Sequence, residues 1–246
     1  MTAIHAAIRV PRVRWGIGAL LGSGVLINYF DRINLSVGAP QLQQEFGLTD
    51  GELGWLFSGF FWSYALLQIP TGMILDRFGV TSVYRVSAFL WSLASGATAF
   101  ASGFIGILAV RLVLGVTEGP ALPASAKATG YWFPRGERAT ATAIFDAAAK
   151  FANVIGVPLV ALAVVQFGWR WGFIITGLLS FLYFLAFLIV YRDPSRHPRL
   201  SPAERDYIRA GGATRDDVTT AIAKTGVVGL LRNGEGPTVM LRADEQ

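Results

Sequence analysis

The sequence predicts an all-α membrane protein with six transmembrane helices and a loosely ordered cytoplasmic tail. Its 246 residues are 53% hydrophobic and only 15% charged, whereas a soluble domain of this size is less apolar and more charged. The apolar residues fall in runs of about 20, which is the length that crosses a bilayer as a helix. Glycine is frequent, with 28 residues, as expected where helices approach one another closely in lipid.

Six apolar runs define the expected spans. They cover residues 13–37, 52–72, 83–101, 103–126, 139–165 and 171–191. The first run follows arginines, as a signal peptide would, but it lacks a small-residue cleavage site and five further spans follow, so a retained helix is expected. The resulting organisation is an N-terminus at 1–12, a bundle at 13–191, a central-loop segment at 192–211 and an atypical tail at 212–246. Trp62 and Trp91 lie deep within their spans and are expected to pack between helices.

The distribution of basic residues predicts the orientation. One side of the expected membrane carries Arg9, Arg12, Arg14, Arg77, Arg85, Lys127, Arg135, Arg138, Arg192, Arg196 and Arg199. The other side carries only Arg170. The positive-inside rule therefore predicts a protein of the cell inner membrane with both termini in the cytoplasm.

Composition argues against several classes of function. The sequence has no cysteine, so disulfides and thiolate metal sites are excluded. His5 and His197 are far apart, so neither a metal site nor another cofactor is expected. The basic residues are spread over loops and form no single stripe, which argues against nucleic acid as a partner.

The most informative pair is Arg111 and Glu118, seven residues apart in an otherwise apolar run. Seven residues are almost two helical turns, so both lie on one stripe, with Gly115 between them. Gly115 leaves room for a ligand or a neighbouring helix. Charge in a membrane span is costly and usually functional. A cation beside a protonatable carboxylate can couple anion movement to proton movement; the alternative is a permanent pair that only joins helices.

A second polar group lies in the first span. Tyr29 and Arg32 share a helical face, and the planar guanidinium suits a carboxylate. Asp31 is rotated by about 100° and can titrate or hold a neighbouring helix. The alternative is a structural ion pair between Asp31 and Arg32.

Two further groups are weaker candidates. Asp146 and Lys150 in the fifth span are four residues apart, a favourable helical pair whose role is functional or structural. Asn153, one turn further on, can add a hydrogen bond to a polar ligand. Between spans two and three, a cytoplasmic loop is expected over 72–79. There Asp76 can cap a helix N-terminus or pair with an arginine in one conformational state.

These motifs resemble a known family. Gly72-x-x-x-Asp76-Arg77-x-Gly79 is similar to the signature loop of the major facilitator superfamily, except that Val80-Thr81 replaces the usual basic pair. A finer resemblance is to its anion:cation symporter branch, which includes bacterial sugar-acid transporters. It rests on Tyr29-x-Asp31-Arg32-x-Asn34, on 111–119, on Tyr131-Trp132-Phe133-Pro134 with Glu137-Arg138, and on Asp193-Pro194, His197-Pro198 and Ser201-x-x-Glu204.

The resemblance implies specific roles. Arg32 and Arg111 would contact a carboxylate substrate, and Asp31 and Glu118 would serve proton coupling. Tyr29 and Asn153 are further substrate-binding candidates. Gly72, Asp76, Arg77 and Gly79 would form a conformational loop. The fold would be the N-terminal six-helix half of a major-facilitator transporter, since these proteins usually combine two such halves around the substrate.

The tail does not fit this family. Residues 220–244 resemble two short strands around a Gly-rich turn, and the last 25 or so residues are similar to a fragment of a hippurate-hydrolase-like amidohydrolase. A gene fusion, a frameshift or an assembly junction near Gly212 is the expectation.

Three functions follow as hypotheses. The first is the N-terminal half of a proton-coupled symporter for a small organic anion, with the lipid bilayer as its environment. The second is a half-transporter fragment that transports nothing by itself, or that pairs with another half. The third is a membrane-tethered amidohydrolase fragment, although an enzyme is not expected.

Overall fold

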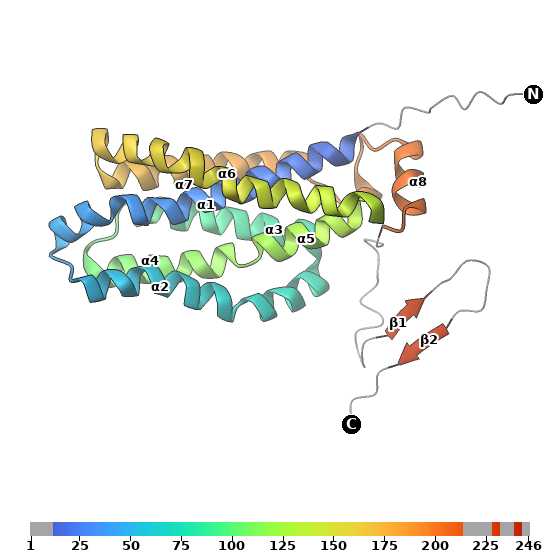
Figure 1. Ribbon diagram of the computed structural model, residues 1–246. Helices are drawn as coiled ribbons and strands as arrows, with labels where there is room; N and C mark the ends of the chain where they lie inside the picture. Colours follow the sequence, from blue (N-terminus) through green and yellow to red (C-terminus); the bar gives the residue numbers. More distant parts are fainter. Residues whose placement is uncertain (1–11, 214–227, 232–238, 243–246) are drawn as a thin grey trace, which may run out of the picture.

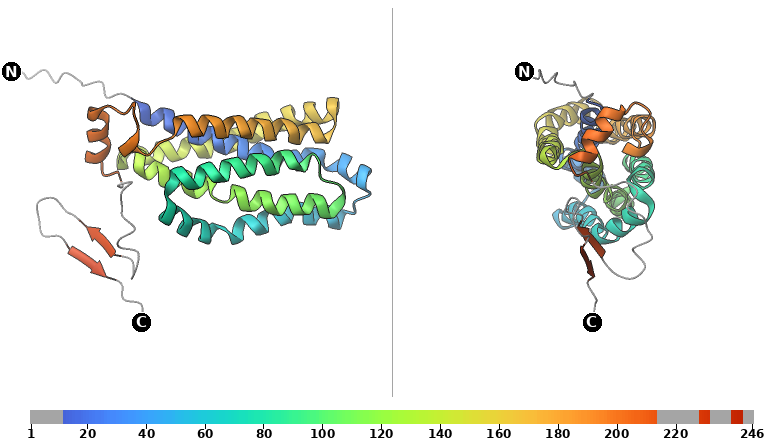
Figure 2. Two further views of the ribbon diagram at one scale, coloured as in Figure 1. Left: turned by 180° about the vertical axis from the view of Figure 1, so that it is seen from behind. Right: turned by 90° about the vertical axis from the view of Figure 1, so that its right-hand side faces the viewer.

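The helices form one elongated bundle (Figure 1). The computed structural model describes residues 12–213, 228–231 and 239–242. The bundle consists of α1 (Val13–Phe46), α2 (Asp50–Leu66), α3 (Gln68–Thr98), α4 (Gly103–Glu118), α5 (Ala121–Trp132), α6 (Arg135–Phe167) and α7 (Trp169–Val190). A 3₁₀ turn, η1 (Pro194–Arg196), and α8 (Pro202–Ala210) follow. Both lie at the end of the bundle where α1 begins (Figures 1 and 2).

Local sequence signals set several of the helix ends. Thr49 caps α2 in a capping box, in which its hydroxyl accepts from the Glu52 amide and the Glu52 carboxylate accepts from the Thr49 amide. Gly47 ends α1 in the left-handed region at φ 63°, a conformation that glycine adopts without a steric penalty. Ser201 caps α8 through the amide of Glu204, and Pro202 occupies its first turn.

The predicted loop over 72–79 is wrong. The chain stays helical from Gln68 to Thr98, and only Gly79 leaves the helical region, with φ 77° and ψ 162°. The residues before Gly79 are mostly ordinary helix formers, and a single glycine is enough to kink the helix. The signature residues Gly72, Asp76 and Arg77 therefore lie on the helical segment that precedes the kink.

Three helical segments of the described chain are long and apolar enough to cross a membrane: Gly103–Trp132, Arg135–Phe167 and Trp169–Val190. The first of these comprises α4 and α5, which Gly119-Pro120 separates, and it extends beyond the predicted end at 126. The predicted end of the first span at 37 is also too early for the helix, because the polar residues that follow continue α1 to Phe46. The count of six spans stays a prediction.

The core lies between α1 and its neighbours. α1 packs against α6 and α7, α3 packs against α7 and α4, and α2 packs mainly against α4. Trp91 on α3 is fully buried and donates from Nε1 to the Ser180 hydroxyl at 2.8 Å, which confirms its expected place between helices. The same expectation for Trp62 is wrong, because this side chain on α2 is 61% exposed.

The segment after α7 is fastened to the bundle by buried charges. The Glu204 carboxylate on α8 accepts hydrogen bonds from the amides of Val13 and Arg14 at 3.2 Å each, so it caps the N-terminus of α1. Arg14 also forms ion pairs with Glu204 at 3.0 Å and with Glu137 on α6 at 2.7 Å. α8 therefore holds the first turns of α1 and α6 together.

Two short strands occur in the tail. β1 (Val228–Leu231) pairs with β2 (Val239–Arg242) in antiparallel register, with Val228 opposite Arg242. Most of the remaining tail, including the predicted Gly-rich turn at 232–238, lies outside the described residues.

Candidate functional site

The centre of the bundle contains a cluster of buried charges from α1 and α4. The Nε atom of Arg32 lies 3.7 Å from the Glu118 carboxylate. Glu118 is fully buried, Arg111 is 2% exposed, and the Arg32 side chain is 17% exposed. The structure therefore brings Arg32, Arg111 and Glu118 together. Of the three, Arg32 is the most accessible.

Several polar atoms of this cluster make no hydrogen bond within the described chain. They are Arg32 Nε, Arg111 Nε and Nη1, both carboxylate oxygens of Glu118, and Asn28 Nδ2. Buried polar atoms are nearly always paired, and leaving one unpaired costs about 1–3 kcal/mol. Unused guanidinium donors in a membrane bundle therefore point to a group that arrives to accept from them.

Neither alternative to function matches this geometry. Arg111 and Glu118 form no ion pair within 4 Å, and Glu118 pairs with Arg32 instead. Asp31 and Arg32 do not pair with each other either, because Asp31 points toward different helices. Arg32 Nη2 donates to Asn28 Oδ1 at 3.0 Å, one turn away on α1.

Aromatic rings surround the two guanidiniums. Arg32 Cζ lies 4.8 Å from the ring centroid of Tyr29, and 5.0 Å from those of Phe60 and Tyr64. Arg111 Cζ lies 4.9 Å from the centroid of the same Phe60 ring. Such contacts stabilise a desolvated cation without neutralising it. The predicted residue Tyr29 therefore belongs to the site.

Asp31 occupies a separate polar pocket between α1, α3 and α7. Its fully buried carboxylate accepts from the hydroxyls of Ser95 on α3 and, at 3.4 Å, Ser180 on α7. Ser95 also lies 3.3 Å from the Thr176 hydroxyl, to which Asn34 donates at 2.6 Å. The carboxylate of Asp31 therefore joins helices, which is one of the two roles that the sequence left open.

The predicted residues on α6 make no hydrogen bond or ion pair with this cluster in the described chain. Asp146, Lys150 and Asn153 are exposed. Asn153 donates to the Ala149 carbonyl of its own helix at 2.9 Å. The predicted Asp146–Lys150 ion pair does not form, since the two side chains are not within 4 Å of each other. Asp146 lines a groove of about 490 Å³ with residues of α3, α5 and α6.

The signature segment makes one charged contact. Lys127 on α5 donates from Nζ to Asp76 at 2.5 Å and to the Leu75 carbonyl at 3.1 Å. Asp76 thus pairs with a lysine in this conformation. The sequence had led us to expect a pair with an arginine or a cap on a helix N-terminus. Arg77 is exposed and lies over the Phe78 ring at 5.4 Å.

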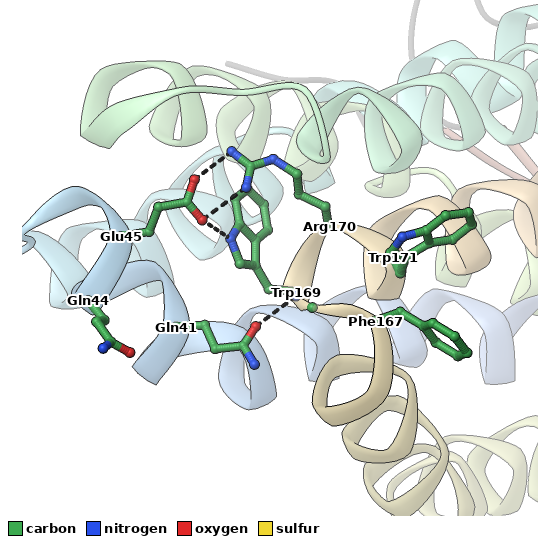
Figure 3. Close-up of a pocket in the computed structure, with 8 residues that line it drawn as sticks. Gln41, Gln44, Glu45, Phe167, Trp169, Arg170 and Trp171 are labelled. Carbon is green, nitrogen blue, oxygen red and sulfur yellow. Dashed lines mark hydrogen bonds and ion pairs between the residues drawn. The ribbon is translucent and has the colours of Figure 1, made fainter.

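A second cavity, of about 420 Å³, lies between the end of α1 and the start of α7 (Figure 3). It is lined by Gln41, Gln44, Glu45, Phe167, Gly168, Trp169, Arg170 and Trp171. The Arg170 guanidinium donates two hydrogen bonds, of 2.7 and 2.9 Å, to the Glu45 carboxylate, and Trp169 Nε1 donates to the same carboxylate at 2.7 Å. These polar groups satisfy one another and join α1 to α7, so the cavity does not show the unused donors of the central cluster.

Two residues of the central site, Phe60 and Tyr64, were not predicted from the sequence, and Asn28 was given no role there. Phe60 and Tyr64 are four residues apart on α2 and therefore share a face. That spacing is visible in the sequence, but α2 is rich in aromatics, and only the packing shows which rings meet the arginines.

Comparisons with known proteins identify the family of this chain. The model of the Major Facilitator Superfamily matches residues 21–238. The chain is 44% identical to an uncharacterized transporter, YybO, of Bacillus subtilis, over 83% of this chain and 47% of that protein. It is 37% identical to the probable galactarate/D-glucarate transporter GudP of the same organism, over 85% of this chain and 48% of that protein. The chain thus spans about half the length of these relatives.

A solved structure supports the fold. The proton:xylose symporter XylE, bound to 6-bromo-6-deoxy-D-glucose, matches 81% of this chain and 49% of its own, with a TM-score of 0.67 at 16% identity. The relatives are named as transporters and not as enzymes. The chain therefore belongs to the Major Facilitator Superfamily of integral membrane proteins, and its relatives support the anion:cation symporter branch that its motifs resemble.

Proposed function

We propose that this chain binds a small organic anion, a sugar acid such as galactarate or glucarate, as part of a proton-coupled secondary transporter. The observation that carries the proposal is the pair of guanidiniums of Arg32 and Arg111, in which Arg32 Nε and Arg111 Nε and Nη1 have no acceptor in the described chain. A carboxylate matches those donors in charge and in planar geometry. The printed name of the relative GudP supplies the substrate class.

The proposed roles follow from accessibility. Arg32 and Tyr29, both partly exposed, meet the anion first, and Arg111 behind them provides further donors. Asn153 on α6 and Tyr64 on α2 add contacts from neighbouring helices. The cell inner membrane with both termini in the cytoplasm is the proposed setting, because the basic residues gather on one side.

Glu118 is the proposed site of proton coupling, supported by Asp31. Its carboxylate and the substrate carboxylate are both negative and compete for the same arginines, so a proton on Glu118 removes their repulsion. The segment from Gly72 to Gly79 is the proposed conformational element, because its Asp76–Lys127 contact joins α3 to α5 beside the kink.

Anion binding to the purified chain in lipid nanodiscs tests the proposal. Titration calorimetry with glucarate should show saturable binding. In Arg32→Ala and in Arg111→Ala the dissociation constant should rise roughly tenfold or more, because each variant removes a charge-assisted contact. Arg170→Ala is the matched control, since this arginine serves the other cavity. Unchanged affinity in both site variants would contradict the binding role of the arginines.

A second candidate is a unit that binds the anion but moves it only when paired with another half. It is favoured by the coverage of about half of each curated relative. Uptake into proteoliposomes under a pH gradient distinguishes a chain that transports by itself from one that transports only with a second half. Binding without uptake by the chain alone, together with uptake when a second half is co-reconstituted, supports this candidate.

A further inference from the structure

We infer that Phe60 on α2 is a positioning residue for anion binding, an inference that rests on the proposed function. Its ring is shared by both guanidiniums, with Arg32 Cζ at 5.0 Å and Arg111 Cζ at 4.9 Å from its centroid. The ring is fully buried. Two like charges from different helices are therefore held by one uncharged side chain from a third helix.

The face of an aromatic ring suits this task better than a polar side chain. The ring attracts a cation through its quadrupole and leaves the N–H groups at the edge of the guanidinium free. A carboxylate or amide in the same place would accept from those N–H groups. The structure agrees with this expectation for a ring, because Arg32 Nε, Arg111 Nε and Arg111 Nη1 remain without an acceptor in the described chain.

The position of the ring is fixed by a close backbone contact between α2 and α4. A Cβ on Gly115 of α4 would lie 2.5 Å from the Phe60 carbonyl oxygen and 3.1 Å from the Tyr64 amide nitrogen. Gly59 directly precedes Phe60, and a Cβ on Gly59 would lie 2.7 Å from Leu108 Cδ1 on α4. The backbone of Phe60 is thus pressed against α4 one helical turn from Arg111. The Tyr64 ring stacks on the Phe60 ring at 5.7 Å with an interplanar angle of 21°, which limits its rotation.

A fluorination series at Phe60 tests the inference with almost no change of shape. Fluorine withdraws charge from the ring face, so mono-, di- and trifluorophenylalanine weaken the attraction to a cation in steps. We expect the dissociation constant for glucarate, measured on the full chain in nanodiscs, to rise at each step and by roughly tenfold across the series. A ring that only fills space would show no such order.

Phe173 on α7 provides the matched control. It is also buried, and its ring meets Trp169 with no cation over it among the contacts of the described chain. The same series at Phe173 should leave the affinity unchanged. A flat series at Phe60, or an equal trend at both positions, overturns the inference while the binding of glucarate by the unsubstituted chain still supports the proposed function.

Thermal unfolding without ligand distinguishes a failure of the proposed function from a failure of the inference about Phe60. The unfolding midpoint should fall stepwise with fluorination at Phe60 and stay level at Phe173, because the ring also stabilises two buried cations. If the unsubstituted chain binds no glucarate but this trend appears, binding by the chain fails and the contact between ring and arginines stands. If the midpoints are flat at Phe60, the inference fails whatever the binding result.

Discussion

At the scale of single residues, two acids with the same predicted role have different surroundings. Asp31 accepts hydrogen bonds from two hydroxyls and lies between α3 and α7, whereas Glu118 accepts none and faces Arg32. A carboxylate without hydrogen bonds beside the substrate's own arginines is the one that responds when an anion arrives. Glu118 is therefore the first candidate for proton coupling, and Asp31 is the second.

The variant Glu118→Gln tests this order. The amide keeps the shape of the side chain but cannot exchange a proton, so glucarate binding should persist while accumulation driven by a pH gradient is lost. Binding in nanodiscs and uptake into proteoliposomes, with a second half co-reconstituted where the chain alone does not transport, measure the two effects. Asp206→Asn, an exposed acid on α8, should change neither. Accumulation that survives in Glu118→Gln would move the coupling role to another group.

Much of this site could be predicted from the sequence, because charge within apolar runs is conspicuous. The stripe of Arg111, Gly115 and Glu118 follows from helical spacing alone. The Arg32–Glu118 contact and the separation of Asp31 could not be predicted, since they depend on how α1 is rotated against α4 and α7. Helical periodicity fixes which residues share a face and leaves open which helix that face meets.

At the scale of elements, apolar runs predicted where helices occur more reliably than where they end. The polar end of α1 and the helical 72–78 segment show why, since neither polarity nor a signature motif by itself stops a helix, and α1 continues even through Pro40. Trp62 and Trp91 are both large and apolar, yet one is exposed and the other buried. In a membrane protein, hydrophobicity does not distinguish a face toward lipid from a face toward protein, because both are apolar.

The close contact between α2 and α4 predicts what the added methyl group of Gly115→Ala does to stability and binding. Gly115→Ala would place a Cβ against Ser63 Oγ and 2.5 Å from the Phe60 carbonyl, so the helices must separate. We expect a loss of about 1–3 kcal/mol in stability, typical of overpacking, and weaker glucarate binding because Phe60 moves with α2. Thermal unfolding in detergent and titration calorimetry measure these two effects.

Gly106→Ala is the control for this prediction, since it lies on the same helix and its added Cβ would come no closer than 3.8 Å to another atom. Its stability should be unchanged or higher by up to about 1 kcal/mol, because alanine favours the helix. Equal effects of the two substitutions would show that the close approach at Gly115 is not what positions α2.

At the scale of the whole molecule, the segment after α7 closes one end of the bundle. Besides the Glu204 contacts with α1, the Arg135 amide donates to the Gly211 carbonyl at 2.8 Å. Arg138 Nη2 donates to the Gly212 carbonyl at 2.9 Å. His197 is buried against the Trp132 ring of α5, with centroids 5.2 Å apart and nearly perpendicular planes. The sequence predicted a central-loop segment here, but not its role as a clasp, which holds the first turns of α1 and α6 together, because that role depends on contacts nearly 200 residues apart in the chain.

The buried histidine makes this clasp sensitive to pH. Burial removes water from the charged form and lowers the pKa of His197 below its usual 6.5. The Nδ1 atom accepts from the Arg199 amide at 3.3 Å, a bond that requires an unprotonated nitrogen. Between the folded and unfolded pKa values the unfolded chain holds a proton that the folded chain lacks, so stability rises with pH in that interval. The stability that His197 contributes should therefore be present above about pH 7 and decline as the pH falls through 6.5.

The variant His197→Phe should remove this pH dependence while it keeps a ring against Trp132. Thermal unfolding midpoints of the wild type and the variant, recorded from pH 8 to pH 5, give the difference at each pH. The advantage of the wild type should be largest at pH 8 and shrink toward pH 5, because phenylalanine does not titrate. His5→Phe changes the other histidine of the chain and should leave the wild-type profile as it is. A constant difference between wild type and His197→Phe would mean that the clasp does not depend on the charge of His197.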